Sequence, residues 1–395
     1  MINVAFTAPQ SREWMGGVSY HKNLFFAISQ LDNKQICPIV FLGKNTDKAI
    51  IDLLRPHAKI ILDSLFDTKS IKFKLASFIA YYLSWPVFHN RIFEKHDIDV
   101  AHHVYGPYKG LKFKTVSWIP DFQHVHLPGL FTKRDVKERN KSIKSLLQVS
   151  NATILSSHDA YRDCLNFEIG PKKHLHILQF VSQPNPEVFN LKINFCKDKY
   201  DLPQRYFYLP NQFWKHKNHL QVFKAVKQLK NLGLDVTVVC SGSMHDYRHP
   251  QHIEEIRSYI KDNKLEKNII LLSLIDYLDV LYLMRFSVSV INPSLFEGWS
   301  STVEECKSIG KNMILSDLNV HKEQNPAESS YFELTSPTSL ENLLKNAWLE
   351  NKAIPNIELE KQAAKLLPIR TREFAEQFQL IILSVMSDSA NSKES

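Results

Sequence analysis

The chain has few cysteines, and they are not spaced to form a framework. Its 395 residues contain five, which are odd in number, widely separated and without a Cys-x-x-Cys pair: Cys37, Cys164, Cys196, Cys240 and Cys306. A disulfide-stapled domain or a cysteine zinc module needs paired, closely spaced thiols. The sequence therefore favours free thiols in a reducing cytoplasm.

Long hydrophobic runs are also absent. The first six residues lead directly into a short apolar strand without a basic region or cleavage site, so we expect no signal peptide. The longest apolar stretch, residues 75–88, is shorter than the roughly 20 residues that span a bilayer. This stretch is aromatic and follows Lys72 and Lys74, which leaves two interpretations open: a core helix, or a helix lying in a membrane interface.

The chain has fewer acidic residues (41) than lysines and arginines (49), which gives a net charge of +8. The excess lysines and arginines gather at residues 109–114 and 133–144, and no nucleic-acid-binding module accompanies them. We therefore expect no nucleic-acid partner. A solvated surface and peripheral contact with an anionic membrane both fit these clusters, so the expected location is the cytoplasm, with the inner face of the membrane as the alternative.

The length exceeds what one hydrophobic core organises, so two domains are expected. Strand-like and helix-like segments alternate as in doubly wound α/β proteins. The expected strands are residues 2–7, 37–42, 100–103, 115–119 and 152–156, and then 206–209, 234–240, 269–272, 286–291 and 312–316. A polar, proline-containing break at residues 183–186 separates the two series.

The most informative segment is residues 292–305, which reads Asn-Pro-Ser-Leu-Phe-Glu-Gly-Trp-Ser-Ser-Thr-Val-Glu-Glu. It follows an expected strand and opens a helix predicted over residues 302–309, with Ser301 and Glu304 at capping-box spacing and Gly310 at the C-terminal cap. Backbone N–H groups at the start of a helix lack intrahelical partners and favour anions, so a diphosphate would be stabilised there.

Two acids in this segment, Glu297 before the helix and Glu305 within it, could hold opposite ends of one extended ligand. The alternative is that Glu304 caps the helix, Glu305 is a solvated helix residue and Glu297 is an ordinary loop acid.

Two further segments could contact phosphate. Gly16 and Gly17 follow the first strand and permit close approach of the backbone, although an ordinary turn would also use them. Lys217 precedes a helix expected from about residue 219 to 232 and can act as a point charge on a diphosphate. A lysine-rich helix start is the alternative, but positive charge there is unfavourable and calls for an anion.

Together these segments resemble the retaining glycosyltransferases of family 4, also called group 1. The resemblance is carried by Glu297-x7-Glu305 with its flanking residues, by Gly16-Gly17-Val18, by Lys217-Asn218-His219, and by His321 and Glu323. It extends from residue 1 to about 372. It implies the GT-B fold, an α/β architecture of two Rossmann-like doubly wound domains facing across a cleft. Residues 1–186 would bind the acceptor, residues 187–372 would bind the donor, and 373–395 would be a helix returning to the first domain plus a disordered tail.

The resemblance also implies roles for individual residues. Glu297 would contact the hydroxyls of the donor sugar as an orienting or stabilising acid, and Glu305 the ribose hydroxyls. The implied catalytic residues are Glu297, Lys217 and Asp121, and the acceptor-side residues are Asp121 and His124. The implied donor-binding residues are Gly16, Gly17, Gln212, Lys217, Leu274, Ile275, Gly298, Ser300, Ser301, Thr302 and Glu305.

Two positions depart from the family pattern. Gln212 stands where the family usually has an arginine, which removes a bidentate partner of the diphosphate, although Lys215 could compensate. Pro120 stands where many relatives have histidine, while Asp121 follows it. A metal is not expected, because the His124-x-His126 pair lacks a third ligand at recognisable spacing and Asp97-Ile98-Asp99 reads as a polar strand entry.

The sequence thus predicts a metal-independent, retaining transferase with no cofactor. Its partners would be a nucleoside-diphosphate sugar donor and a glycan or lipid-linked glycan acceptor, in surface polysaccharide or lipopolysaccharide biosynthesis. The alternatives are a non-catalytic nucleotide-sugar-binding subunit, favoured by Gln212 and Pro120, and a GT-B epimerase. The nucleotide base, the sugar, the linkage and the oligomeric state stay open.

Overall fold

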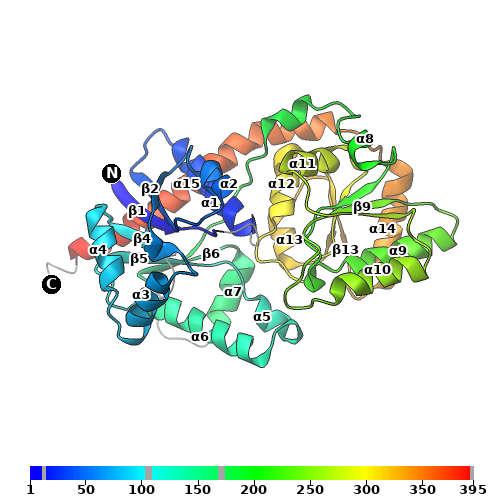
Figure 1. The fold of residues 1–395 in the computed structure, drawn as a ribbon. Coiled ribbons are helices and arrows are strands. Elements are labelled where there is room, and N and C mark those ends of the chain that lie inside the picture. Colours follow the sequence, from blue (N-terminus) through cyan, green and yellow to red (C-terminus); the bar gives the residue numbers. More distant parts are fainter. Residues whose placement is uncertain (11–14, 103–108, 168–173, 392–395) are drawn as a thin grey trace. The chain divides into compact units, whose positions relative to one another are not determined.

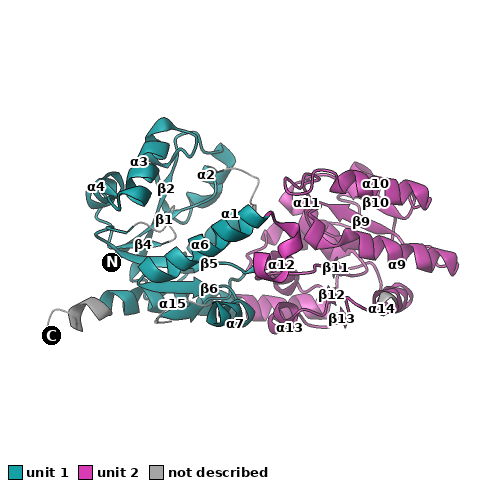
Figure 2. Cartoon of the chain, turned by 90° about the horizontal axis from the view of Figure 1, so that it is seen from below, with its two compact units in different colours: residues 1–122, 133–181, 368–395 teal, residues 123–132, 182–367 magenta. Residues whose placement is uncertain are grey.

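The computed structural model describes residues 1–10, 15–102, 109–167 and 174–391. The chain divides into two compact α/β units, coloured separately in Figure 2. Unit 1 contains Met1–Phe122, Lys133–Val181 and Pro368–Ser395, and unit 2 contains Gln123–Thr132 and Ser182–Leu367. The ten residues 123–132 therefore group with unit 2, although both of their chain neighbours group with unit 1.

Unit 1 is built on a parallel sheet of seven strands in the order β3-β2-β1-β4-β5-β6-β7. Its strands are β1 (Ile2–Thr7), β2 (Ile36–Leu42), β3 (Lys59–Leu62), β4 (Val100–His102), β5 (Lys114–Ile119), β6 (Ala152–Leu155) and β7 (Leu175–Ile177). The strand order reverses at β1, which pairs with both β2 and β4, as in doubly wound sheets. The sequence anticipated five of these strands but not β3 or β7, and the last residue of the strand expected at 100–103 lies outside the described residues.

The helices of unit 1 are α1 (Met15–Ser29), α2 (Lys48–Leu54), α3 (Ile71–Tyr82), α4 (Val87–Lys95), α6 (Lys133–Val149), α7 (His158–Asn166) and the later part of α15 (Ile357–Asn391). Gly16 and Gly17 lie in the first turn of α1, so the expected glycine loop is wrong there. Helix α15 packs on β1, with the ring centroids of Phe378 and Phe6 separated by 5.9 Å. The predicted disordered tail beyond it, residues 392–395, lies outside the described residues.

Unit 2 has a parallel sheet of six strands in the order β10-β9-β8-β11-β12-β13. They are β8 (Phe207–Leu209), β9 (Val238–Ser241), β10 (Ile269–Leu272), β11 (Val290–Asn292), β12 (Met313–Ser316) and β13 (Ser330–Phe332). Its helices are α5 (Gln123–His126), α8 (Lys197–Tyr200), α9 (His219–Asn231), α10 (His252–Asp262), α11 (Tyr277–Phe286), α12 (Ser301–Ile309), α13 (Asn319–Gln324), α14 (Pro337–Glu350) and the first part of α15.

The sheet of unit 2 is covered on both faces. Phe207 and Leu209 belong to a core shared with α9, α10 and α14, whereas Tyr208 between them belongs to a core shared with α11 and α12. Successive strand residues point to opposite faces, so both kinds of position must be apolar when helices lie on both sides. This explains why the strands of unit 2 are short continuous apolar runs.

Helix α3 is not the core helix that the apolar stretch at residues 75–88 suggested. The stretch divides into α3 and α4, and α3 buries only Ala76 and Ala80. The interpretation as a core helix is therefore wrong, because most of the large apolar residues of α3 face solvent. Within the described parts of the chain, no helix is both long and apolar enough to cross a membrane.

Candidate functional site

The loop between β11 and α12 forms the centre of a polar cluster in unit 2. Asn292 ends β11, Pro293 stops the strand, and Ser300 caps α12 by accepting a hydrogen bond from the Val303 N–H at 3.4 Å. The predicted cap at Ser301 is therefore wrong by one residue. Gly310 ends the helix with φ of 71°, as expected, and a side chain there would collide with the backbone of Leu359 and Glu360.

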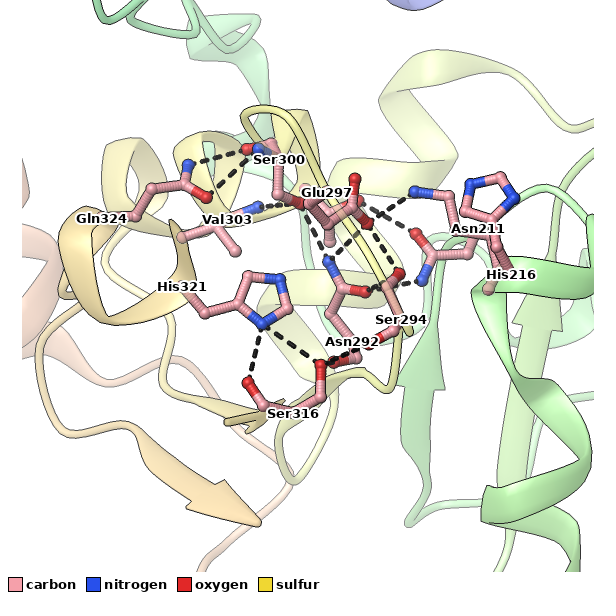
Figure 3. A network of polar contacts seen from close by, with 12 residues as sticks. Asn211, His216, Asn292, Ser294, Glu297, Ser300, Val303, Ser316, His321 and Gln324 are labelled. Carbon is pink, nitrogen blue, oxygen red and sulfur yellow. Dashed lines mark hydrogen bonds and ion pairs between the residues drawn. The ribbon is translucent and has the colours of Figure 1, made fainter. Parts of the chain in front are cut away.

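The carboxylate of Glu297 is held through one of its two oxygens (Figure 3). Its Oε1 accepts from Lys217 Nζ at 2.6 Å, from Ser294 Oγ at 2.6 Å and, more weakly, from Asn292 Nδ2 at 3.5 Å. Among the described residues, none donates to Oε2. The side chain is thus fixed in orientation while one oxygen keeps its capacity to accept hydrogen bonds.

The ion pair between Lys217 and Glu297 is largely buried, with side-chain exposures of 16% and 10%. Burial alone would raise the pKa of Glu297, but the charge of Lys217, the influence of His321 and the hydrogen bonds from Lys217 and Ser294 together lower it to about 2. Glu297 is therefore ionised at neutral pH. The sequence predicts an external anion next to Lys217. In the structure the carboxylate of Glu297 already pairs with the Lys217 ammonium.

The N-terminus of α12 is only partly available to a ligand. The Ser300 N–H, expected to contact a diphosphate, donates to Gln324 Oε1 at 3.1 Å, and Gln324 Nε2 donates to Ser300 O and to Glu304 Oε1, both at 3.0 Å. Gln324 of α13 thereby positions both the cap and the buried acid Glu304. The N–H groups of Ser301 and Thr302 have no hydrogen-bond partner among the described residues, so these two can still receive an anion.

Asparagine side chains connect this loop to the end of the neighbouring strand β8. Asn211 Nδ2 donates to Asn292 Oδ1 at 3.1 Å, and Thr302 Oγ1 donates to Asn211 Oδ1 at 3.4 Å. Asn292 Nδ2 in turn donates to Ser300 Oγ at 2.9 Å. The carboxyl ends of adjacent strands, where ligands of open α/β sheets bind, are thus joined by buried amides.

The segment that carries Lys217 is attached to the Glu297 loop by the backbone as well. Lys217 lies in a 3₁₀ turn at Lys215–Lys217 before α9, where the Leu295 N–H donates to His216 O at 2.8 Å. Asn218 Nδ2 donates to Pro293 O at 3.1 Å. These bonds hold the Lys217 ammonium in place beside the carboxylate.

His321 of α13 is a buried neutral imidazole close to Glu297. Its Nδ1 lies 2.9 Å from Ser316 O, a carbonyl that can only accept, so this nitrogen carries the proton. Burial lowers the pKa of His321, although the negative charge of Glu297 acts in the opposite direction. Its Nε2 is an acceptor and has no hydrogen-bond partner within the described part of the chain.

Arg248, which the sequence did not single out, joins residues 123–132 to the rest of unit 2. Its guanidinium donates to Gln123 Oε1 at 3.0 Å, lies 3.3 Å from His216 Nδ1 and stacks on Phe131 and Trp214 at 5.1 and 5.2 Å. Its position in the loop after β9, at the carboxyl end of a parallel strand, is the signal that could have identified it.

Residues 123–132 also contact the segment that contains Glu297. The ring centroids of His126 and Phe296 are 5.1 Å apart, and the buried His124 lies 6.4 Å from the Phe131 ring. The sequence placed His124 in the first domain, whereas the structure groups it with unit 2. A segment expected on the acceptor side is therefore packed against the residue before Glu297.

The remaining predicted residues are distributed over both units. Glu305 accepts from the Tyr277 hydroxyl at 3.1 Å. Gln212 and Gly298 lie half-buried in the two loops of the cluster, Leu274 is 63% exposed after β10, and Ile275 is half-buried. Gly16, Gly17 and Asp121 belong to unit 1. No group of three metal-ligating side chains is found among the described residues.

Comparisons with known proteins bear on the family and on the fold. Residues 193–364 match the family model described as "Glycosyl transferases group 1". No curated protein sequence matches the chain. Among solved structures, Anabaena HepE in complex with UDP and glucose is 14% identical with a TM-score of 0.71, covering 97% of this chain and 100% of its own.

Two further structures share the fold. A glycosyltransferase from Rickettsia africae is 16% identical with a TM-score of 0.62, covering 100% of this chain and 97% of its own. WaaG, described as involved in lipopolysaccharide biosynthesis, is 12% identical with a TM-score of 0.58 and 98% of each chain covered. The architecture is that of the GT-B fold, as predicted. Residues 193–364 thus match the family that the sequence predicts, over somewhat less than half of the chain.

Proposed function

We propose that this glycosyltransferase moves a sugar from a nucleoside-diphosphate donor to a glycan acceptor with retention of anomeric configuration. The observation that carries the proposal is the state of Glu297. Its carboxylate is ionised and fixed through Oε1, while Oε2 has no donor among the described residues. An acceptor oxygen held in this way can orient the hydroxyls of a sugar.

The leaving diphosphate is stabilised by two groups in this proposal. The free N–H groups of Ser301 and Thr302 lie at the positive end of α12, and Lys217 supplies a positive charge. Such preorganised donors stabilise charge as it develops and are often the largest single contribution to catalysis. The Lys217 ammonium would then interact with both the diphosphate and the Glu297 carboxylate. In this proposal Glu297 orients the sugar and does not act as a nucleophile.

The donor base and the acceptor form the second part of this proposal. HepE has been solved with UDP-glucose, which makes a uridine diphosphate sugar the first donor to test. Glu305, positioned by Tyr277, would bind the ribose hydroxyls, with Gln212, Leu274, Ile275 and Gly298 as further donor-binding residues of unit 2. Asp121 and His124 would serve the acceptor, a glycan or lipid-linked glycan of a surface polysaccharide or lipopolysaccharide. The reaction requires no metal ion in this proposal.

Nucleotide binding is tested first, by thermal unfolding of the purified protein with UDP, GDP, ADP or CMP, each with and without magnesium. A ligand at a hundredfold excess over Kd stabilises the native state by about 2.7 kcal/mol. We expect UDP to raise the midpoint without magnesium. A protein that responds to none of the four nucleotides would contradict the proposed donor site.

Turnover is tested with UDP-sugars and glycan acceptors in Glu297→Gln and Lys217→Met. Both variants should lose transfer by about a hundredfold or more, the scale for removing one preorganised group. Lys224→Met is the matched control, because Lys224 is an exposed lysine of α9 in the same unit, and it should retain activity. Binding without turnover would favour the non-catalytic subunit, and isomerisation of the free nucleotide sugar would favour the epimerase.

A further inference from the structure

Helix α3 of unit 1 presents large apolar side chains to solvent along one face. Ile71, Leu75, Phe78 and Tyr82 are 84%, 53%, 55% and 69% exposed. Their spacing of four, three and four residues places them in one stripe along the helix. The residues that α3 buries are the small Ala76 and Ala80. Helix α3 therefore exposes large apolar side chains to solvent and buries small ones.

The stripe continues beyond the end of α3, and the last turn of the helix is rich in aromatic residues. Leu83 and Trp85 are 62% and 60% exposed. The Phe78 and Tyr82 rings are 4.9 Å apart, and the Tyr81 and Tyr82 rings are 5.0 Å apart. Scattered single apolar residues need no explanation on a protein surface, but a contiguous patch of this kind marks a binding surface.

Helix α6 places a row of lysines beside this aromatic end. Only Ile143 of α6 is buried. Its lysines at positions 133, 137, 141 and 144 line one hollow together with Lys109, and none of the described residues that line the hollow is acidic. Lys141 Nζ lies 5.3 Å from the centroid of the Tyr81 ring, so the lysine row meets the apolar stripe. Figure 2 shows α3 and α6 in the teal of unit 1, and both helices are also labelled in Figure 1.

We propose that the exposed face of α3, residues 83–85 and the lysine row of α6 form a docking surface for an anionic lipid bilayer. Aromatic and aliphatic side chains on one helix face insert into the interface between headgroups and acyl chains. Lysines beside them are attracted to the phosphates of anionic lipids. Aromatic residues are also enriched at this depth of the membrane.

The same charges argue against a second copy of this chain as the occupant. A symmetric dimer through this face would bring two lysine rows toward each other, and like charges facing each other across an interface oppose association. An anionic bilayer satisfies both components of the surface, since it offers an apolar layer directly beneath a layer of phosphates.

Flotation with lipid vesicles tests the proposal on the purified full chain. The vesicles contain phosphatidylcholine with or without phosphatidylglycerol. One variant combines Phe78→Ser with Tyr82→Ser, and another combines Lys137→Ser, Lys141→Ser and Lys144→Ser. Since each lysine at an anionic surface contributes about a fivefold change in partitioning, the lysine variant should lose binding by about tenfold or more. The aromatic variant should also lose binding.

Matched controls carry the same chemical changes on unit 2. Lys261→Ser, Lys267→Ser and Lys345→Ser together remove the same net charge from exposed positions, and Leu232→Ser with Leu349→Ser removes exposed apolar groups. Both controls should float like the unaltered protein, and binding should require phosphatidylglycerol. Midpoints of thermal unfolding of the patch variants should stay unchanged, because the altered side chains are exposed.

Three results would overturn the proposal: equal binding to vesicles without phosphatidylglycerol, binding that survives the patch substitutions, or a lipid-free dimer in sedimentation that the patch substitutions dissociate. The assay needs neither donor nor acceptor. Its outcome therefore stands apart from that of the proposed glycosyl transfer.

Discussion

Two apolar segments of similar appearance in the sequence have opposite environments in the structure. Residues 288–292, which lead into and form β11, are fully buried between helices on both faces of the sheet, whereas α3 turns its large apolar residues to solvent. Hydrophobicity predicted a regular element in both places. The comparison shows that the neighbours of a segment, rather than its own composition, decide whether it is covered.

The polar residues around the two segments differ in the same way. At the end of β11, Asn292, Glu297 and Lys217 find one another within the protein and form bonds that are largely shielded from water. Around α3 the charged partners stay exposed, as in the pair of Lys72 with Asp63 at 2.9 Å. The buried bonds fix the positions of the Glu297 and Lys217 side chains. The exposed charged side chains around α3 can still interact with a partner.

The largest effect on stability is expected at the Lys217 and Glu297 pair. Glu297→Ala leaves a largely buried ammonium without its partner, which typically costs about 3–5 kcal/mol. The double variant with Lys217→Met should recover part of that loss. Urea unfolding of the two single variants and the double variant gives the coupling energy. The exposed pair of Arg257 and Glu254 serves as the control, where about 1 kcal/mol or less is expected.

A matched pair of isoleucines measures the contrast between the two segments directly. Ile291→Ala in β11, where the side chain is fully buried, should lose about 2–5 kcal/mol of unfolding free energy. Ile71→Ala in α3, where the side chain is 84% exposed, should change it by about 0.5 kcal/mol or less. Comparable losses at both positions would mean that α3 is covered in solution.

Acid should remove the stabilisation that Glu297 provides. The pKa of Glu297 is about 2 in the folded protein and lies near 4.5 when the side chain is solvated. Between these values the unfolded chain binds more protons, so the contribution is full above about pH 4.5 and is lost as pH falls toward 2. Its size at neutral pH is about 3 kcal/mol.

Urea unfolding from pH 5 down to about pH 2 measures this contribution. The stability difference between the unaltered protein and Glu297→Gln should shrink over that range. Phe78→Gln in the exposed stripe is the control, since its effect should not vary with pH. A difference for Glu297→Gln that stays constant would contradict the depressed pKa.

The smallest effects are expected at the two helix caps. Ser300→Ala in α12 and Ser70→Ala in α3 each remove a side-chain cap and should each lose about 1 kcal/mol. Ser301→Ala should change stability less, because Ser301 is the first helical residue rather than the cap. Thermal unfolding of the three variants checks whether the cap of α12, next to the buried strand β11, stabilises the protein as much as the cap of the exposed helix α3.

Much of the fold could be predicted because its signals are local. Strand β1 and strand β10 coincide with the ranges expected from sequence, and α9 differs only at its last residue. Alternation of apolar strands and helices sufficed for the doubly wound class. Strands β3, β7 and β13 were missed because they are short and also incompletely buried, so they lack a long continuous apolar run.

The candidate site was predicted in part for a similar reason. Glu297 and Lys217 could be chosen from motifs, but their pairing depends on the spatial contact of two loops 80 residues apart. Gln324 accepts from the Ser300 N–H and belongs to no motif, and Arg248 is marked only by its position in the loop after β9. Their roles arise from tertiary contacts, which one sequence does not reveal.

Unit 1 contains both the first strand of the chain and the last turns of α15. Phe378 packs on Phe6, and Gln379 bonds to the Gln35 N–H at 2.8 Å and to Asn33 O at 3.1 Å. On the ribosome, these residues emerge only after the whole of unit 2 has been synthesised. We therefore expect unit 1 to complete its core after unit 2 has been synthesised, whereas an N-terminal domain usually folds first. Unit 2 can assemble during translation, while the core of unit 1 waits for its final helix.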